Sequence, residues 1–256
     1  MSRSRREPVI TRDGGPVVDP LTGTVALCQR QVRALCFEWS RLADTGSVGS
    51  SREWTNTTHD WSRSVDVVHL ATIRADPAAF APTGVLHLIF EVVAYAAEEA
   101  MDNGNGRCTI VLHADDSISV ADNGRGTDTR WDAAGSAVRK PVMSTKDLRF
   151  FDSPLAPMLP DDWPRRGMSV VAALSEWLAH TNRRLDASWV QRYERGVPVT
   201  DLQRISDDGT NGTTVHFRPA ADLDRTELVT ASDLRDLTSS WRELHVDVTD
   251  RRSGPA

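Results

Sequence analysis

The segment from Val85 to Met101 constrains the fold of this chain more than any other part of the sequence. Its apolar residues recur at helical spacing, so they form one face of a long amphipathic helix. The helix follows Pro82 and Thr83, of which Thr83 can cap it, and the turn-forming run Asp102–Gly106 ends it. The apolar face consists of Val85, Ile89, Val92, Val93, Ala96 and Ala100. Such a face has to be covered by a second layer of structure.

Strand patterns follow this helix directly. Two short strands, Cys108–His113 and Ser117–Ala121, flank the turn Ala114–Asp116 and predict a β-hairpin. The other predicted elements are a short helix before Pro77, a helix at Met168–Ala179, strands near Asn182–Arg184, Trp189–Arg195 and Thr213–Arg218, a helix at Ala231–Leu244 and a last strand at His245–Thr249. This order predicts an α+β fold, a two-layer sandwich of helices on one face of a mixed, mostly antiparallel sheet.

The first 64 residues have a different pattern from the rest. Residues 1–21 carry Pro, Gly and Asp without periodicity, which predicts a mobile arm. A loose apolar stripe predicts a helix from about Val25 to Leu42, and the polar run Asp44–Thr58 predicts a linker or exposed loop. We therefore expect an N-terminal extension over residues 1–64 and one domain over residues 65–256.

The composition narrows the classes of function. Thirty basic residues against 36 acidic ones leave a net charge of -6, which argues against broad nonspecific DNA binding. The three cysteines are an odd number without metal-like clustering, so we expect reduced thiols and no disulfide scaffold. No run approaches the ~18 consecutive apolar residues of a membrane span, and the basic start is not followed by an apolar stretch. We expect a soluble, cytoplasmic protein.

The helix carries polar residues opposite its apolar face, namely His87, Glu91, Tyr95 and Glu98. A carboxylate four residues after a histidine can share a hydrogen bond with it, which fits a general base oriented by its neighbour. The alternative is the solvated polar face of an ordinary amphipathic helix, and the helix alone favours that alternative.

Two further segments can recognise a flat ligand. The run from Asp122 to Gly126 follows a strand and places a carboxylate beside a Gly-X-Gly pattern, where the backbone can approach a ligand closely. A carboxylate acceptor suits the exocyclic amine of adenine. The run Asn211–Phe217 opens a strand with Gly-Thr-Thr and can place a hydroxyl beside that carboxylate. Taken separately, the first pattern is an ordinary turn and the second carries no information.

In their order and spacing, the three segments resemble the ATPase domain of type II topoisomerases, most closely that of the gyrase B protein, within the gyrase–chaperone–histidine kinase–mismatch repair superfamily. The resemblance extends over about residues 65–252. It is carried by IRADPAAF (73–80), LHLIFEVV (86–93), EEAMD (98–102), TIVLHADDSISVADNGRG (109–126), RGMSVVAALSEWL (166–178), YERGVP (193–198), NGTTVHFRP (211–219) and HVDVTDRR (245–252). It implies the two-layer ATP-binding fold of that superfamily, the Bergerat fold.

The resemblance also implies an adenine site. Asp122 would accept a hydrogen bond from the adenine amine, with Thr213 supporting it through water, and Gly126 would let the backbone approach the base. Arg125 would pair with Glu99 and brace the edge of the pocket. The other residues that it places at the nucleotide are Asn123, Gly124, Gly167, Met168 and three wall residues, Val92, Val120 and Val215.

The implied catalytic pair is Glu91, as the general base that activates water, and His87, which orients it. One position departs from the family pattern. The family has an Asn that helps to hold Mg²⁺, and this chain has Tyr95, whose phenol is a poor ligand for a hard cation. We therefore expect no metal site, and use of Mg²⁺ is in question.

The lid segment departs as well. The family wraps the triphosphate with a Gly-rich loop, whereas this chain has Asp161-Asp162-Trp163-Pro164-Arg165-Arg166-Gly167. Pro164 has no N–H to offer, and of the glycines only Gly167 is kept. Arg165 and Arg166 could bind phosphate by charge, or they could be a solvated basic pair. From its length, we also expect the chain to lack the DNA-cleaving domains of a complete topoisomerase.

The leading hypothesis is a degenerate, stand-alone gyrase B-like pseudoenzyme that binds ATP, ADP or a related adenine compound and hydrolyses ATP weakly or not at all alone. A second hypothesis is a slow or partner-completed ATPase linked to DNA topology, with Arg165 or Arg166 replacing the lid. A third is a nonenzymatic interaction module that has lost the nucleotide. The expected partners are the adenine nucleotide and a protein, gyrase or another, with homodimerisation a weaker expectation. Membrane binding and direct DNA binding are not expected.

Overall fold

The computed structural model describes residues 17–18, 25–26, 59 and 65–252, except 104, 128–129, 136, 139–140, 185–186 and 224–228. The chain divides into two compact units, Met1–Trp54 and Thr55–Ala256. In the first unit, β1 (Val17–Val18) pairs antiparallel with β2 (Val25–Ala26). The predicted helix at residues 25–42 is therefore wrong at its first two residues, and its remainder, the predicted arm and the polar loop lie outside the described residues.

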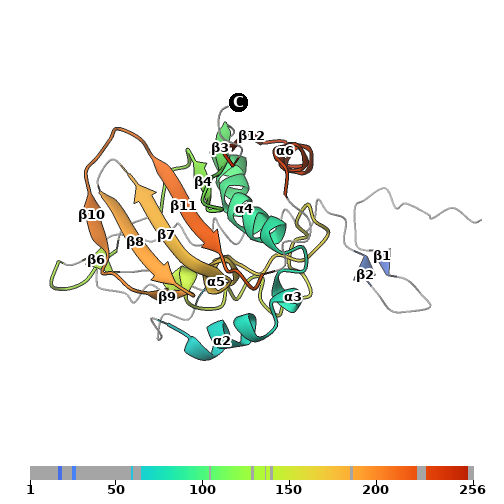
Figure 1. Cartoon of the computed structure of the whole chain (residues 1–256), viewed down its shortest axis with the longest axis horizontal. Helices are drawn as coiled ribbons and strands as arrows, with labels where there is room; N and C mark the ends of the chain where they lie inside the picture. Colours follow the sequence, from blue (N-terminus) through green and yellow to red (C-terminus); the bar gives the residue numbers. More distant parts are fainter. Residues whose placement is uncertain are drawn as a thin grey trace, which may run out of the picture. The chain divides into compact units, whose positions relative to one another are not determined.

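The second unit is built on an eight-stranded sheet with the order β10-β8-β7-β11-β4-β3-β12, and β9 pairs with β8 (Figure 1). All neighbours are antiparallel except β12, which runs parallel to β3. The strands are β3 (Gly106–Leu112), β4 (Ile118–Asp122), β7 (Ser175–Arg183), β8 (Ser188–Glu194), β9 (Val197–Pro198), β10 (Gln203–Ile205), β11 (Gly212–Pro219) and β12 (Leu244–Asp250). This architecture confirms the predicted α+β class with a mixed, mostly antiparallel sheet.

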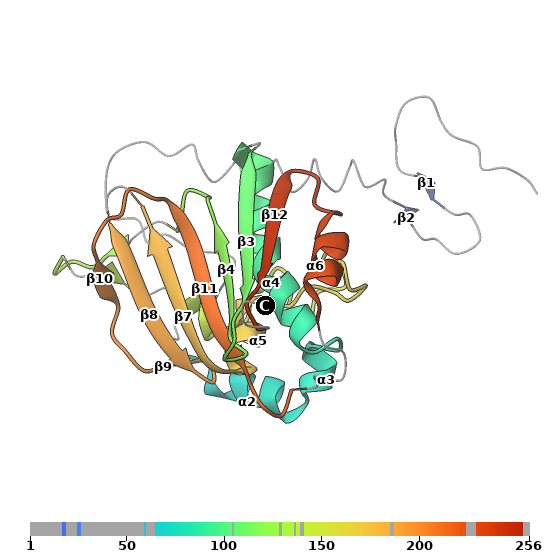
Figure 2. The ribbon, with the colours of Figure 1, turned by 45° about the horizontal axis from the view of Figure 1, so that its top comes forward.

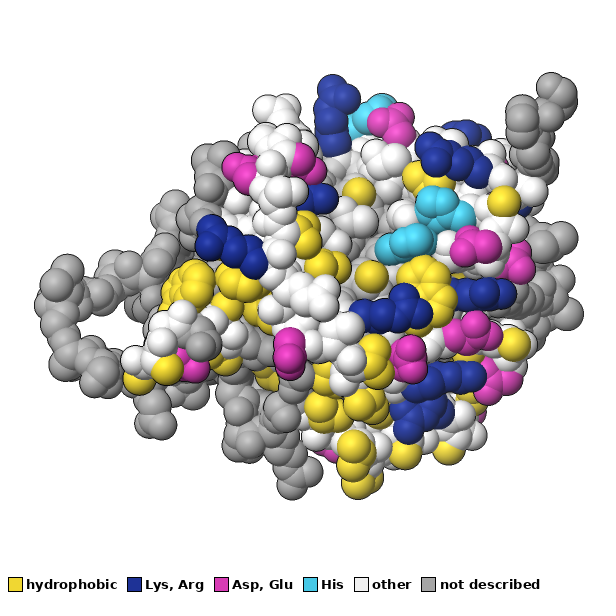
Figure 3. Space-filling view, turned by 60° about the vertical axis from the view of Figure 1, so that its left-hand side comes forward, with side chains coloured by type: hydrophobic (Ala, Val, Ile, Leu, Met, Phe, Trp, Pro, Cys, Tyr) yellow, Lys and Arg dark blue, Asp and Glu magenta, His cyan; other side chains and the backbone are white. Residues whose placement is uncertain are grey.

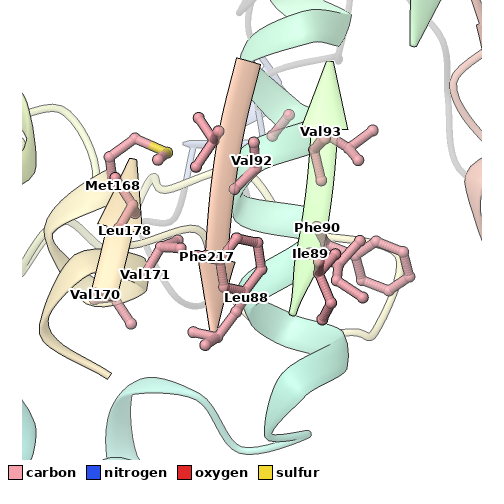
Figure 4. Close-up of a cluster of buried hydrophobic side chains, with 14 of the residues drawn as sticks. Leu88, Ile89, Phe90, Val92, Val93, Met168, Val170, Val171, Leu178 and Phe217 are labelled. Carbon is pink, nitrogen blue, oxygen red and sulfur yellow. The ribbon is translucent and has the colours of Figure 1, made fainter. Parts of the chain in front are cut away.

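Helices cover one face of this sheet (Figure 2). The long helix α4 (Val85–Asn103) packs against β3, β4 and β12, and α5 (Met168–Ala173) packs against α4 and β7. Between them lies a core of fully buried side chains, among which Leu88, Val171 and Phe217 come from α4, α5 and β11 (Figure 4). The remaining elements are α2 (Val67–Ala75), α3 (Pro77–Phe80), η1 (Pro141–Met143), α6 (Ala231–Thr238) and the pair β5 (Arg130–Trp131) and β6 (Ala137–Val138).

Helix α4 is the central element of this core. By length and composition alone, an 18-residue window within Pro77–Ala100 is apolar enough to cross a membrane. However, 56% of that window is buried inside the unit, and its polar side chains His87 and Glu91 are buried with it. A helix with this burial pattern is the core helix of a two-layer domain.

Two predicted helices are longer than the helices that form. The helix predicted over Met168–Ala179 ends at Ala173, and the chain continues as strand β7 from Ser175. The reason is tertiary, because β7 lies between β8 and β11 and receives ladder hydrogen bonds on both sides. The predicted last helix, 231–244, ends at Thr238. Thr83 is not at the predicted cap position, because α4 begins at Val85 and Gly84 directly precedes it; the Thr83 hydroxyl donates to Asp161 Oδ2 at 2.6 Å.

Candidate adenine-type site

A cavity of about 350 Å³ lies between α4 and the inner face of the sheet, within the size range of small-molecule sites. Four buried side chains from four elements form a large part of its apolar lining. Val92 comes from α4, Met168 from the start of α5, Val120 from β4 and Val215 from β11, and all four are buried. Val120 and Val215 are directly opposite each other across the β4–β11 pair, so they form one flat apolar floor.

Asp122 lies at the edge of this floor, at the end of β4. Its Oδ1 accepts hydrogen bonds from the backbone N–H groups of Gly124, at 2.9 Å, and Thr213, at 3.1 Å. Burial raises the pKa of the Asp122 carboxyl, and these two hydrogen bonds oppose that rise. Among the described residues none donates to Oδ2, so this oxygen can accept a hydrogen bond from a ligand in the cavity.

The other residues of the Asp122–Gly126 run serve different purposes. The side-chain oxygen of Asn123 accepts from the backbone N–H of Arg107 at 2.6 Å, so Asn123 fixes the end of the hairpin and does not line the cavity. Arg125 Nε lies 3.1 Å from Glu99 Oε1, and both side chains line the cavity.

Gly126 also lines the cavity, but a side chain is absent here because the backbone of Gly126 lies against strand β7. It has a φ of +72°, and a Cβ there would lie 2.6 Å from the carbonyl oxygen of Arg183. Gly124 is similarly close-packed, because a Cβ would lie 2.6 Å from Glu99 Cγ. The backbone of this loop is therefore held against β7 and α4.

Glu91 and His87 form a buried chain of charges beside the cavity, without lining it. His87 Nδ1 lies 2.8 Å from Asp161 Oδ2, and His87 Nε2 lies 3.4 Å from Glu91 Oε1. Burial lowers the pKa of His87, but the hydrogen bonds and charges of Asp161 and Glu91 outweigh burial and raise it to about 9. His87 is therefore an imidazolium between two carboxylates. The interpretation of this side of the helix as a solvated face is wrong, because both residues are fully buried.

The lid segment closes over Glu91. The backbone N–H groups of Arg166 and Gly167 both donate to its carboxylate, the Gly167 bond at 2.9 Å. Gly167 has a φ of +102°, and a Cβ at this position would lie 2.9 Å from Asp147 Cβ. The N–H of Gly167, a residue that the resemblance places at the nucleotide, thus binds the protein's own carboxylate together with the N–H of Arg166.

Arg165 is buried and does not point to solvent. Its guanidinium donates to both oxygens of Glu98, at 2.5 and 3.2 Å, and lies 4.2 Å over the ring of Tyr95 and 4.1 Å over the ring of Phe150. Its Nε is 3.9 Å from Glu91 Oε2. The interpretation of Arg165 as part of a solvated basic pair is therefore wrong, since its side chain is only 3% exposed.

The side chains around Tyr95 do not fit a bound Mg²⁺ ion. Mg²⁺ takes carboxylate oxygens and water in octahedral geometry. The Tyr95 hydroxyl instead donates to Asp147 Oδ2 at 3.1 Å, and burial raises its pKa. The Arg165 guanidinium already supplies positive charge beside Glu91 and Glu98. Within residues 59 and 65–252, gaps aside, no group of three or more His, Cys, Asp or Glu is arranged to hold a metal ion.

Several residues of the site are missing from the sequence-based prediction. Asp147 and Asp161 lie in irregular segments and reach α4 only because the chain folds back over it. Trp189 and Gln191 line the cavity from β8, and His180 and Asn182 line it from β7. Their alternation along each strand is a signal that could have identified them, had the extent of β7 been known.

Comparisons with known proteins find relatives among the B proteins of DNA gyrase and DNA topoisomerase 4. No family model matches the chain. The B protein of DNA gyrase from Archaeoglobus fulgidus is 31% identical over 179 residues, 67% of this chain and 28% of that protein. The B protein of DNA topoisomerase 4 from Bacillus subtilis is 30% identical over 175 residues, 66% of this chain and 27% of that protein. The B protein of DNA gyrase from Thermotoga maritima is 36% identical over 138 residues, 53% of this chain and 22% of that protein. The matched region is thus less than a third of each relative.

Proposed function

The chain carries a DNA gyrase B-like domain, and from this premise we propose that it binds an adenine nucleotide, ATP, ADP or a related compound, and hydrolyses ATP weakly or not at all by itself. Similarity to these relatives supports nucleotide binding by an ATPase-type domain. The observation that carries the binding proposal is the carboxylate of Asp122 beside the floor of Val120 and Val215, with its Oδ2 left to accept from a ligand.

The loss of hydrolysis is argued from Glu91. A general base has to lie within hydrogen-bond reach of the water that it activates. Here the Glu91 carboxylate is fully buried, accepts N–H bonds from Arg166 and Gly167, and faces an imidazolium at His87. Water can reach it only after the lid segment has moved.

The phosphate site supports the same proposal. Phosphoryl transfer depends on metal and donor groups that stabilise charge at the transferring phosphate. The surroundings of Tyr95 do not fit Mg²⁺, and Arg165 is held by Glu98. We therefore expect nucleotide binding that does not depend on Mg²⁺. The alternative of a slow ATPase needs an arginine that replaces the lid at the phosphates. Of Arg165 and Arg166, only Arg166 is partly exposed and could take this role.

We also propose that the protein is cytoplasmic and acts through a partner protein or a second copy of itself. It does not bind DNA directly in this proposal. The last point is supported by the surface on the β10 side, where basic and acidic side chains are interspersed (Figure 3). Neutralising DNA phosphates needs a continuous basic surface.

The test is calorimetric titration of the full chain with ATP and ADP, with and without Mg²⁺. Asp122→Asn should weaken binding at least about tenfold, because the adenine amine loses a charged acceptor. Asp115→Asn is the matched control, since Asp115 also accepts a backbone N–H two residues ahead but lies in an exposed turn. Binding that strictly requires Mg²⁺, or that survives Asp122→Asn, contradicts the proposal.

A turnover assay separates the alternatives. ATP hydrolysis that is lost in Glu91→Gln would establish the slow ATPase. If neither nucleotide binds at millimolar concentration, the chain is the interaction module, and its partner becomes the object of study.

A further inference from the structure

The cavity does not end at the adenine-type half but continues across the sheet. Strand pairing places Thr213 opposite Asn182, and Asn182 opposite Trp189. Thr213 in turn donates its N–H to Asp122. Asp122 on β4 and Trp189 on β8 therefore belong to one row that crosses four neighbouring strands, and all four side chains line the cavity.

A second row runs beside the first and shows how the chemistry changes along the cavity. Val120 is opposite Val215, Val215 is opposite His180, and His180 is opposite Gln191. These four residues also line the cavity. Strands β4 and β11 thus contribute an apolar floor with Asp122 and Thr213 at its edge, whereas strands β7 and β8 contribute polar and aromatic side chains.

The two halves are too far apart for one base to fill both. Neighbouring strands are about 4.8 Å apart, so the three steps from β4 to β8 amount to about 14 Å. An adenine ring held at Asp122 leaves the β7–β8 half unfilled.

The β7–β8 half contains a hydrogen-bond donor without a partner. The indole N–H of Trp189 is buried and has no acceptor among the described residues. A buried tryptophan N–H usually has one, and leaving it unpaired costs stability. The neighbouring amides are occupied, because Asn182 bonds the backbone of Thr127, and Gln191 bonds the Thr200 carbonyl.

The charges around the cavity favour an uncharged group. Both arginines that line it already hold a carboxylate, Arg149 through two bonds to Asp147 and Arg125 at 3.1 Å from Glu99. Neither contributes an unneutralised positive charge for an anionic group. A neutral acceptor, in contrast, would complete the hydrogen bonding of Trp189 without adding charge.

We infer that the β7–β8 half of the cavity is a second subsite that binds an uncharged planar carbonyl or amide group, and that the ligand is an adenine compound carrying such a group. The oxygen of this group accepts a hydrogen bond from the indole N–H of Trp189 after a small rotation of the indole ring. The plane of the ligand group lies over the polar side chains of His180 and Gln191. The adenine part of this inference rests on the proposed function, whereas the subsite at Trp189 rests on the cavity alone.

The test uses nicotinamide as the probe of the second subsite and adenosine as the probe of the first. The eight tryptophans give separate indole N–H signals in a ¹⁵N-edited NMR spectrum, and the signal lost in Trp189→Phe identifies Trp189. Nicotinamide should move this signal downfield both without and with saturating adenosine. Trp189→Phe should weaken nicotinamide binding about tenfold and leave adenosine binding unchanged. Trp163→Phe, which changes a tryptophan that is 46% exposed and does not line the cavity, is the matched control.

Each failure has a separate meaning. If nicotinamide leaves the Trp189 signal in place up to its solubility limit, or competes with adenosine, the second subsite is refuted. If nicotinamide binds at Trp189 while neither adenosine nor ADP binds, the subsite stands and the proposed adenine site fails.

Discussion

Replacing Glu91 with glutamine distinguishes a carboxylate that is fully hydrogen-bonded inside the protein from a general base that is ready to activate water. The carboxylate accepts N–H bonds from Arg166 and Gly167 and faces the His87 imidazolium at 3.4 Å. Glutamine keeps the volume and one acceptor oxygen, but its NH₂ group faces a backbone N–H donor. One buried N–H is then left without an acceptor, and the imidazolium keeps only Asp161 as a charged partner.

The expected cost follows from these contacts. A buried N–H without an acceptor costs about 1–3 kcal/mol. Breaking a buried ion pair by removing one charge costs about 3–5 kcal/mol, and this figure already contains the relief of no longer burying the carboxylate. Because His87 keeps Asp161 as a charged partner, only part of the ion-pair cost applies, and we expect Glu91→Gln to lower the free energy of unfolding by about 3–5 kcal/mol in total. For a domain of this size, that lowers Tm by roughly 6–20 °C.

Urea unfolding followed by tryptophan fluorescence measures this change, with the m-value showing that the unfolding reaction stays the same. Glu176→Gln is the control. Glu176 lies 3.4 Å from Arg218, both side chains are about 40% exposed, and such pairs contribute about 0–1 kcal/mol. A general base held ready for water is often a source of strain, so its removal leaves stability unchanged or raises it. If Glu91→Gln is as stable as the wild type, the sealed arrangement is refuted.

Three further perturbations test other parts of the structure. The pKa of His87 rises from 6.5 to about 9 on folding, so its contribution to stability is complete below pH 6.5 and is lost as pH rises through about 9. The urea concentration at the midpoint of unfolding should therefore fall between pH 6.5 and about 9, and His87→Asn should remove this dependence on pH. Gly126→Ala should cost about 3 kcal/mol, since its Cβ meets the Arg183 carbonyl, whereas Gly209→Ala, at a similar φ with open space around it, should cost about 1 kcal/mol in the same assay. Leu178→Ala should cost about 2–5 kcal/mol in urea unfolding, because Leu178 is fully buried in β7, an interior strand of the sheet. A loss below about 1 kcal/mol would contradict that placement.

Local sequence is enough to predict the helix and the hairpin that hold the site. The apolar spacing of residues 85–101 predicts helix α4, and the turn after Leu112 predicts the β3–β4 hairpin; both form as expected. Asp122 could be placed at the end of that hairpin for the same reason. These features depend on neighbours along the chain, where side-chain periodicity and turn chemistry act directly.

The tertiary structure decided the state of the site. Glu91 receives its N–H donors from residues 75 and 76 positions away, and the partner of His87 lies 74 positions away. No periodicity links such residues, so the helix alone favours a solvated polar side for α4, and only the contacts with the lid segment show that His87 and Glu91 are buried. The strand at Ser175–Arg183 was likewise decided by pairing with β8 and β11, which outweighed a local helical pattern. Burial and long-range hydrogen bonds exist only once distant segments meet, and these contacts set the charge state of His87 and close off Glu91.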